Sequence, residues 1–586
     1  MSKIIKDTDT VNLIKAGCNQ TLNLIQPEIT NLNTDISNLD DNITLYTSET
    51  GYKAYFDIRR TGKLYQVKVP KYNYNTSPTC IKTLDNAGLI CIPSTNLVEN
   101  QDDYQDIELF KWYRCNYTRN QYGIPTITAV EDTDDFATTG NVDVGTFGMS
   151  FYWSWIDGSD SNYSSLNLDS NYYYLTISDM PNTTWGLNLW TGCQDEQGND
   201  IGYWCYSTYF SGNVNQDLRS QPNLFPVRWM CYNYMASNST TTITDNNKGS
   251  AVYMYQHKGS GYWGAGLDRH LFGYIFYMIK YASKSSQVYF TGCTNYNLQY
   301  IAADTTLTNT NYFPVTQAQA NNFVIGSSVC VGNAYVSNNA KSIDRNNSSM
   351  FSKVRIAKIS EIKQVPNQSY YGIYLVDEDG NNVTISDTSS ITSGDFTLET
   401  YISVLPWISG NTDNIINKHD GQVVNNSKYP YRIQGVEYSI GGWTVVSDTV
   451  MNITSDTNVD FYQVQKGITH VKGTSGTAMD SSTYKAVGSM ITTSKDNFRI
   501  GDVALYNYSE SSKANCVNFY PIVKQTVDNS AHGVGDYCYR NTTSGTTQYR
   551  EVLLGGTLGD TASAGFCDLH CSYSLSNSYW HIVAAD

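Results

Sequence analysis

Residues 549–586, YREVLLGGTLGDTASAGFCDLHCSYSLSNSYWHIVAAD, carry the pattern that decides the fold. From Cys567 to Ser572 apolar and polar side chains alternate strictly, which is the period of a β-strand with one buried and one exposed face. The alternation buries Cys567, Leu569 and Cys571. An ordinary amphipathic terminal strand would produce the same alternation, so the pattern predicts a strand before it predicts a function.

The outward side chains of this segment are mostly small or polar, and they are the candidate ligand-binding residues. They are Thr557, Gly559, Asp560, Ser563, Asp568, His570, Ser572, Tyr573, Ser576, Asn577, Ser578, Tyr579 and His581. We expect them to form one contiguous exposed surface. The partners on the other face, Leu558, Leu569, Leu575 and Trp580, are expected to be buried and to carry the packing.

Upstream of this segment the sequence predicts one long helix, over residues 268–280. Its apolar residues follow the i, i+3, i+4, i+7 spacing of a helix with a buried face. They are Phe272, Ile275, Phe276 and Ile279. Asp268 can cap the N-terminus, and Lys280 and Lys284 are placed to close the C-terminal end. A short turn of helix is expected at Gln317–Asn322.

The first 47 residues contain a heptad pattern in which apolar residues step by four and three. They are Ile25, Ile29, Leu32, Ile36, Leu39 and Ile43. This spacing predicts a coiled-coil stalk at residues 1–47 that attaches the chain to other proteins and joins copies of it. A single amphipathic helix packed on its own domain is the alternative. A trimer is favoured over a dimer, but three heptads do not decide between them.

The rest of the chain is predicted to be mainly β, in an α+β arrangement with few helices. Alternation at Tyr52–Phe56 and Tyr65–Val69 predicts strands in a small β collar at residues 48–107. A large domain follows at residues 108–311 and 408–586. An inserted β module is expected at residues 312–407, with a hairpin turn at Asp379-Gly380.

Composition and charge exclude several classes of partner. Only 16% of residues are charged and 48 are tyrosines, which suits strands joined by polar turns. The net charge is −16 without any stripe of Lys and Arg, so no nucleic-acid partner is expected. The longest strongly apolar run, Leu271–Ile279, is too short to span a bilayer, so no membrane insertion is expected. No export signal is visible, which indicates synthesis in the cytoplasm.

The motifs that could carry a metal or catalysis are weak, and we expect no metal, no cofactor and no enzyme activity. Asp377–Asn382 resembles the start of a calcium loop but lacks the glycine at its sixth position and the closing glutamate. Gln221-Pro222-Asn223 lacks a partner motif, and Asp134-Asp135 is typical of a solvated turn. The thirteen cysteines have no metal-type spacing and are expected to be buried, reduced thiols.

The terminal segment carries a resemblance to a known family. The matching features are Arg550-Glu551, Gly555-Gly556, Ala564-Gly565, the Leu575 to Trp580 spacing and Ala584-Ala585. Together they resemble the variable proteins of the diversity-generating retroelements found in many gut phages. That family has a C-type-lectin (formylglycine-generating-enzyme-like) fold, with its variable region at the end of the chain.

Softer matches extend the resemblance over residues 108–586. Tyr431–Trp443 is similar to the family's segment before the variable strands, Phe276–Ala282 to its helix, and Lys111–Gly148 to its opening strands. Two features depart from the family pattern. Many members carry Trp where Leu558 stands, and a Gly-x-Arg ending where Val583-Ala584-Ala585 stands.

The resemblance implies a phage fibre or tail-tip protein in the virion, whose variable face at residues 549–586 binds a protein or glycan on the host-cell surface. In that family, adenines in a template are miscopied, so that the resulting codons encode Asn, Ser, Thr, Tyr, Asp, His or Gly. The candidate residues above are of these types. The alternatives are a structural decoration or head fibre without receptor role, a depolymerase, and a formylglycine-type oxidase that uses Cys567 and Cys571.

Overall fold

The computed structural model describes residues 49–232, 249–333, 345, 353–393, 396–455, 458–464, 484–491, 496–507, 517–540 and 548–586. The chain divides into two compact units, Met1–Arg59 and Arg60–Asp586. The predicted stalk at residues 1–47 lies outside the described residues. Strands dominate the described part, so the mainly β prediction is confirmed. None of the described helices is long and apolar enough to cross a membrane.

The described part of the first unit contains the helix α4 (Glu49–Asp57), where the alternation predicted a strand. That prediction is wrong because Tyr52 and Phe56, the two residues read as one face of a strand, are also spaced i, i+4. Both are buried. Lys53 and Asp57 are also spaced i, i+4, and their ion pair of 3.0 Å stabilises the helix.

The predicted strand at residues 65–69 is present, but it does not belong to a separate collar. Strand β1 pairs with β7, so that Val67 lies opposite Leu175. The five-stranded sheet has the order β2-β1-β7-β6-β8. Its strands are β1 (Tyr65–Pro70), β2 (Ile81–Leu84), β6 (Tyr152–Asp157), β7 (Tyr172–Ser178) and β8 (Asn188–Leu189). Residues 60–107 therefore belong to the large unit, through a pairing with residues about a hundred positions later that local alternation does not reveal.

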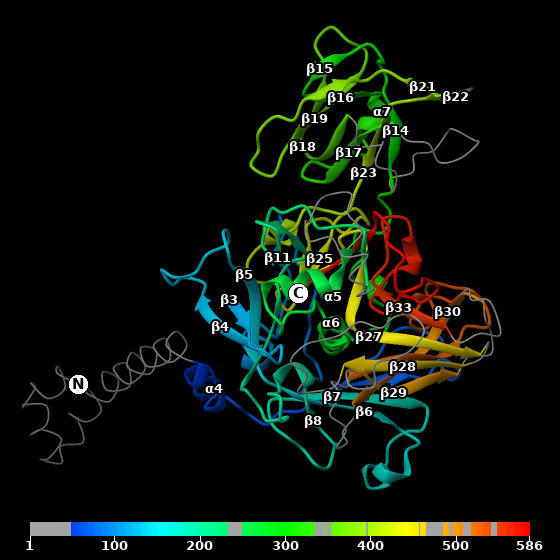
Figure 1. Cartoon of the computed structure of the whole chain (residues 1–586). Coiled ribbons are helices and arrows are strands. Elements are labelled where there is room, and N and C mark those ends of the chain that lie inside the picture. Colours follow the sequence, from blue (N-terminus) through cyan, green and yellow to red (C-terminus); the bar gives the residue numbers. More distant parts are fainter. Residues whose placement is uncertain are drawn as a thin grey trace, which may run out of the picture. The chain divides into compact units, whose positions relative to one another are not determined.

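The predicted long helix is confirmed as α6 (Leu267–Tyr281), which packs against β1, β7, β25, β27 and β31. Figure 1 shows α6 next to β27. All of its residues except Asp268 are buried, as expected for a helix with strands around it. The prediction that Asp268 caps the helix is wrong. The N-cap is Gly266, and the carboxylate of Asp448 accepts a hydrogen bond of 3.0 Å from the backbone N–H of Leu267.

Two further sheets surround α6. A four-stranded sheet has the order β4-β3-β5-β9, and a three-stranded sheet the order β24-β25-β26. Their strands are β3 (Tyr113–Arg119), β4 (Pro125–Val130), β5 (Asp143–Met149), β9 (Tyr203–Ser207), β24 (Gly421–Gln422), β25 (Tyr431–Ile433) and β26 (Val436–Tyr438). The main core combines side chains of α6 with these sheets, the five-stranded sheet and the terminal segment.

A nine-stranded sheet contains the terminal segment. Its order is β29-β28-β27-β33-β34-β32-β30-β31, with β35 paired to β27. The strands are β27 (Trp443–Ser455), β28 (Asn458–Val464), β29 (Tyr484–Ile491), β30 (Phe498–Asn507), β31 (Val517–Lys524), β32 (Tyr537–Tyr539), β33 (Gln548–Leu554), β34 (Leu569–His570) and β35 (Ile582–Val583).

A six-stranded sheet of order β14-β23-β17-β18-β19-β16 is formed by residues that largely coincide with the predicted module at residues 312–407. Its strands are β14 (Gln299–Ile301), β16 (Tyr312–Val315), β17 (Ser328–Gly332), β18 (Val354–Gln364), β19 (Tyr371–Val376) and β23 (Tyr401–Val404). The predicted turn of helix is α7 (Gln317–Ala320), which begins with a capping box between Thr316 and Gln319. The backbone turns at Asp377–Asn381 as expected, and the side chain of Asp377 accepts a hydrogen bond from Asn381 N.

The remaining elements are short. They are α5 (Ala251–Tyr255), the strands β10 (Ser211–Val214), β11 (Asp217–Ser220), β12 (Met230–Cys231), β13 (Gly249–Ser250), β15 (Thr308–Thr310), β20 (Ile385–Asp387), β21 (Ile391–Ser393) and β22 (Phe396–Leu398), and the 3-10 helices η1 (Glu108–Phe110), η2 (Ser161–Leu166), η3 (Thr191–Cys193), η4 (Gln256–Lys258), η5 (Ser286–Val288), η7 (Asn411–Asn414) and η8 (Thr561–Ser563). The eleven cysteines within the described segments are all free and buried, which confirms the prediction for them.

Candidate functional site

The terminal segment supplies three strands of the nine-stranded sheet, drawn in orange to red in Figure 1. Strand β33 runs antiparallel to β27, and β34 lies between β33 and β32. Strand β35 runs parallel to β27, with Ile582 opposite Trp443. Two loops, residues 555–568 and 571–581, connect these strands. Each loop is therefore held at both ends by backbone pairing within one sheet.

The leucines predicted to be buried are buried, and each packs in a different core. Leu558 lies with side chains of the six-stranded sheet, Leu569 in the main core around α6, and Leu575 in a third core beneath α5. Cys567 and Cys571 are fully buried as well. The apolar half of the predicted pattern is confirmed at these five positions.

The polar half of the pattern is wrong at three positions. Asp568 is 0% exposed, His570 5% and Ser578 7%, although all three were predicted to face solvent. The reason is that the strand is limited to Leu569 and His570, and both of its faces are covered. Alternation separates two faces of a strand, but it does not say whether the second face meets solvent or another layer of the protein.

The other candidate residues lie at or near the surface. Gly559 and Ser576 are exposed. The half-buried ones are Thr557, Asp560, Ser563, Ser572, Tyr573, Asn577, Tyr579 and His581. Trp580, which was predicted to be buried, is half-buried, and the guanidinium of Arg345 lies 3.9 Å from its ring centroid. Thr561 and Ala562 are exposed on the same loop as Gly559, and the sequence pattern did not single them out.

Six rings come together where the two loops leave the sheet, and we call them the terminal aromatic cluster. Its members are Trp443, Tyr539, His570, Tyr573, Tyr579 and His581. His570 lies at the centre, with its ring centroid 4.3 Å from that of Trp443 and 4.0 Å from that of Tyr573. Tyr573 in turn lies 4.9 Å from Tyr579. The half-buried tyrosines thus form the outer layer of a stack with a buried base.

Both histidines of the cluster are neutral at physiological pH. Burial, with a smaller contribution from His581, lowers the pKa of His570 to about 3. Burial, with the positive charge of Arg345, lowers the pKa of His581 to about 3. Burial also raises the pKa of Tyr573 to about 12. The cluster therefore offers uncharged rings and hydroxyl groups, which suit contacts by stacking and hydrogen bonding.

The two loops are fixed by their own side chains. Asp560 accepts hydrogen bonds from the backbone N–H (2.6 Å) and the hydroxyl (2.8 Å) of Thr557. In the second loop, Asn577 accepts from the backbone N–H of Ser574 at 2.9 Å and donates to the hydroxyl of Tyr579 at 3.1 Å. Asp560 and Asn577 are thus engaged in shaping the loops.

Three carboxyl groups on or next to the strands of the terminal segment are buried, and sequence reasoning identified none of them as a buried acid. One oxygen each of Asp536, Glu551 and Asp568 has no hydrogen-bond partner among the described residues. Burial raises the pKa of all three well above the ordinary value, and the charges of Asp560 and Asp536 add to the shift at Asp568. These groups are therefore held in the folded protein more easily as neutral acids than as carboxylates.

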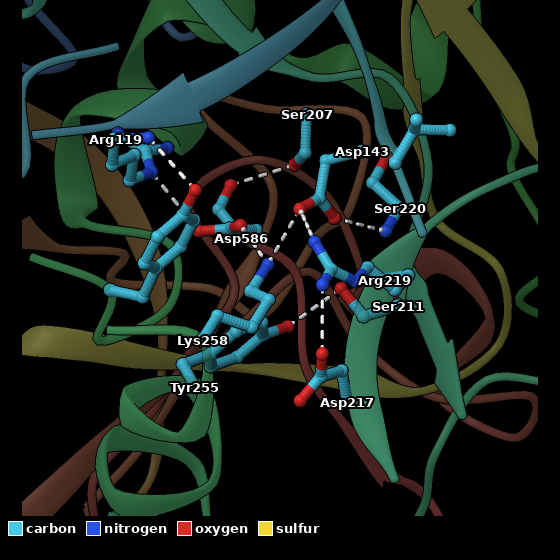
Figure 2. Close-up of polar contacts among 12 residues, drawn as sticks. Arg119, Asp143, Ser207, Ser211, Asp217, Arg219, Ser220, Tyr255, Lys258 and Asp586 are labelled. Atoms are coloured by element: carbon cyan, nitrogen blue, oxygen red, sulfur yellow. Dashed lines mark hydrogen bonds and ion pairs between the residues drawn. The ribbon is translucent and has the colours of Figure 1, made fainter. Parts of the chain in front are cut away.

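A buried ion network holds the last strand in place (Figure 2). The carboxylate of Asp586 lies 2.6 Å from Lys258 Nζ and 3.1 Å from Arg119 Nε. Lys258 Nζ also lies 3.0 Å from Asp143, which pairs with Arg219 at 3.0 Å. Burial alone would raise the pKa of Asp586, but Lys258 and Arg119 lower it below its ordinary value. The network links Asp586, three residues after β35, to Arg119 on β3 and Asp143 on β5, which lie 467 and 443 residues earlier in the chain.

The weaker motifs have local structural roles. The side chain of Gln221 donates to the backbone carbonyls of Gly140 and Val142, and Asp134 and Asp135 are exposed. Burial raises the pKa of the Cys567 thiol well above its ordinary value, the opposite of what a reactive thiolate needs. Among the residues that the structure describes, no group of three or more His, Cys, Asp and Glu side chains is arranged to hold a metal ion.

No protein-family model matches the sequence, and no curated protein is significantly similar to it.

Proposed function

We propose that this chain is a bacteriophage virion protein whose terminal segment, residues 549–586, forms a diversifiable surface that binds a receptor on the host cell. The observation that carries the proposal is the terminal aromatic cluster. Tyr573 and Tyr579 are half-buried on one loop, residues 571–581, whose two ends are paired into the same sheet. Rigid aromatic side chains give a large contact area at low entropic cost, and they are frequent in binding surfaces.

The arrangement of loops and core supports a surface that can change without loss of the fold. The apolar residues Leu558, Leu569 and Leu575 pack in three different cores, whereas Gly559 and Ser576 are exposed between them. Substitution at exposed positions commonly alters stability by less than about 0.5 kcal/mol. A protein of this kind can therefore vary its ligand while keeping its scaffold.

The finer description of the fold is part of the same proposal. We assign residues 108–311 and 408–586 to one C-type-lectin-like domain, interrupted by the six-stranded module. Support comes from α6, the longest of the described helices, which packs against the sheet of the terminal segment, and from the resemblance of residues 549–586 to retroelement variable proteins. The coiled-coil stalk at residues 1–47 and trimer formation complete the proposal.

A binding experiment with labelled full-length protein on intact gut bacteria tests the function. Replacing Tyr573 and Tyr579 together by Ala should weaken adhesion to a responsive strain by more than about 1 kcal/mol, roughly fivefold or more in Kd. The matched control is Tyr74→Ala, because Tyr74 is 55% exposed and lies far from the terminal segment in the sequence. Equal adhesion by all three proteins would refute the proposal and favour a structural decoration of the virion.

The neighbouring DNA offers an independent test of diversification. A reverse-transcriptase gene beside a near-copy of the last ~100 bases of this coding sequence, differing mainly at adenines, is the expected finding. Its absence would leave the receptor-binding role intact and would remove the diversification mechanism.

A further inference from the structure

A small cavity of about 90 Å³ lies at the N-terminus of α6, away from the terminal aromatic cluster. Its walls come from the turn between β3 and β4, from η3, from the loop before α6 and from Asp448 on β27. Aromatic side chains of Tyr122, Tyr206 and Trp263 line it together with polar groups. The cavity is distinct from every residue set considered above as a binding surface.

Glycine keeps the floor of this cavity open. A Cβ added to Gly266 would lie 2.5 Å from Asp448 Oδ2 and 2.6 Å from Asp268 Oδ1, so it would occupy the space between the two carboxyl groups. The backbone at Gly266 has φ −81° and ψ 173°, a conformation that other residues adopt readily. Glycine is therefore needed at position 266 to leave room between the two carboxyl groups, and not because the backbone conformation requires it.

Both carboxyl groups make hydrogen bonds within the protein and also border the cavity. Asp268 Oδ2 accepts a hydrogen bond of 2.9 Å from the hydroxyl of Tyr206. Asp448 Oδ1 accepts from Leu267 N at 3.0 Å and from the hydroxyl of Thr449 at 2.8 Å. The other two oxygens, Asp268 Oδ1 and Asp448 Oδ2, border the space above Gly266.

A third polar group at the cavity, the hydroxyl of Thr191, lacks a hydrogen-bond partner among the described residues. Thr191 lines the cavity and is 6% exposed. A buried hydroxyl without a partner costs free energy, and a bound ligand that hydrogen-bonds with it would remove that cost.

The charges around the cavity favour a cation. Asp195 and Glu196 also line it, whereas the carboxylate of Asp586 is already paired with Lys258 and Arg119. The two arginines in its wall are already engaged: Arg119 with Asp586 at 3.1 Å, and Arg269 with the hydroxyl of Ser207 at 3.0 Å. The groups left to meet a ligand are therefore mainly carboxyl oxygens and aromatic rings, a combination that attracts organic ammonium ions.

We propose that this cavity binds the ammonium group of a small primary amine, which donates hydrogen bonds to Asp268 Oδ1, Asp448 Oδ2 and Thr191 Oγ1. Three N–H donors match three acceptors. The alkyl part of the ligand packs against the rings of Tyr122 and Trp263. This site is independent of the receptor-binding surface at the terminal segment.

Isothermal titration calorimetry of the full chain with propylammonium chloride tests the site, with tetramethylammonium and calcium chloride as comparison ligands. Saturable binding of propylammonium alone is expected, because tetramethylammonium has no N–H donor. Asp448→Asn should weaken binding at least tenfold. Gly266→Ala should do the same, since its methyl group fills the space while both carboxyl groups remain. Asp135→Asn, at an exposed carboxyl group, should leave binding unchanged.

A pH series supplies a measurement that needs no variant. Burial, with the charge of Asp268, raises the pKa of Asp448 to about 7. Burial also raises the pKa of Asp268, and the hydrogen bond from Tyr206 and the charge of Arg119 counter part of that shift. Propylammonium should therefore bind several times more tightly at pH 8 than at pH 6. The proposal would be overturned if the wild type did not bind propylammonium, if it bound calcium more tightly, or if the Asp448→Asn and Gly266→Ala variants bound propylammonium as tightly as the wild type.

Discussion

Replacing Asp568 by Asn should stabilise the protein at neutral pH, although Asp568 was predicted from the sequence to be an exposed contact residue. Its side chain is 0% exposed, Oδ1 has no partner, and Oδ2 lies 3.5 Å from Trp443 Nε1. Burial, with the charges of Asp560 and Asp536, raises its pKa in the folded protein. Asn has almost the same shape and carries no charge, so it removes the cost of burying a carboxylate.

The sign of the pH dependence follows from proton uptake. In the unfolded chain Asp568 loses its proton near pH 3.9, whereas the folded protein retains it to higher pH. The folded state therefore binds more protons, and the free energy of unfolding falls as pH rises through this window. The slope contributed by one proton is about 1.4 kcal/mol per pH unit. The Asn variant should lack this contribution.

Urea unfolding of both proteins at pH 5, 6, 7 and 8 measures the difference. The variant's advantage should grow with pH, by up to about 1.4 kcal/mol for each unit until the folded-state pKa is passed. Asp536 and Glu551 remain in both proteins, so their own pH dependence largely cancels. A variant that is destabilised at pH 7, or a difference that stays below about 0.5 kcal/mol at every pH, would show that Asp568 is exposed and charged.

Three further outcomes follow from the structure and the sequence. Leu575 is 4% exposed, so Leu575→Ala should lower the free energy of unfolding, measured in urea, by about 2–5 kcal/mol. Ser576→Ala, at the exposed neighbouring position, should lower it by less than about 0.5 kcal/mol. Similar losses in the two variants would mean that the loop does not pack as described. Deleting residues 1–47 should leave a folded protein of lower oligomeric order by light scattering, and an unchanged oligomer would assign association to the remaining chain. Adhesion to bacteria should be unchanged when a chelator is added. A loss of adhesion in chelator that added calcium reverses would contradict metal-free binding.

The features that could be predicted from the sequence are those that short-range periodicity determines. The i, i+3, i+4 spacing of Phe272, Ile275 and Phe276 identified α6, because residues at this spacing lie on the same face of a helix. Likewise, Thr316 and Gln319 mark the start of α7 by local hydrogen bonds alone.

The features that failed depend on partners far away in the sequence. Alternation at Leu569 and His570 indicated two faces of a strand, but the rings of Trp443 and Tyr573 cover the second face. The pairing of β1 with β7 also depends on residues about a hundred positions apart, which no local pattern records. For the same reason the buried acids were missed, since a carboxyl group in a loop is exposed in most proteins.

The enclosure of α6 has a consequence for synthesis on the ribosome. Its covering groups include Tyr438, whose hydroxyl donates to the carbonyl of Arg269, and Phe566, whose carbonyl meets the ring of His270. At roughly 5–20 residues per second, the ribosome needs roughly 15–60 s after α6 to reach Phe566. For that time a strongly apolar helix lacks its final cover, so we expect the nascent chain to depend on holding chaperones.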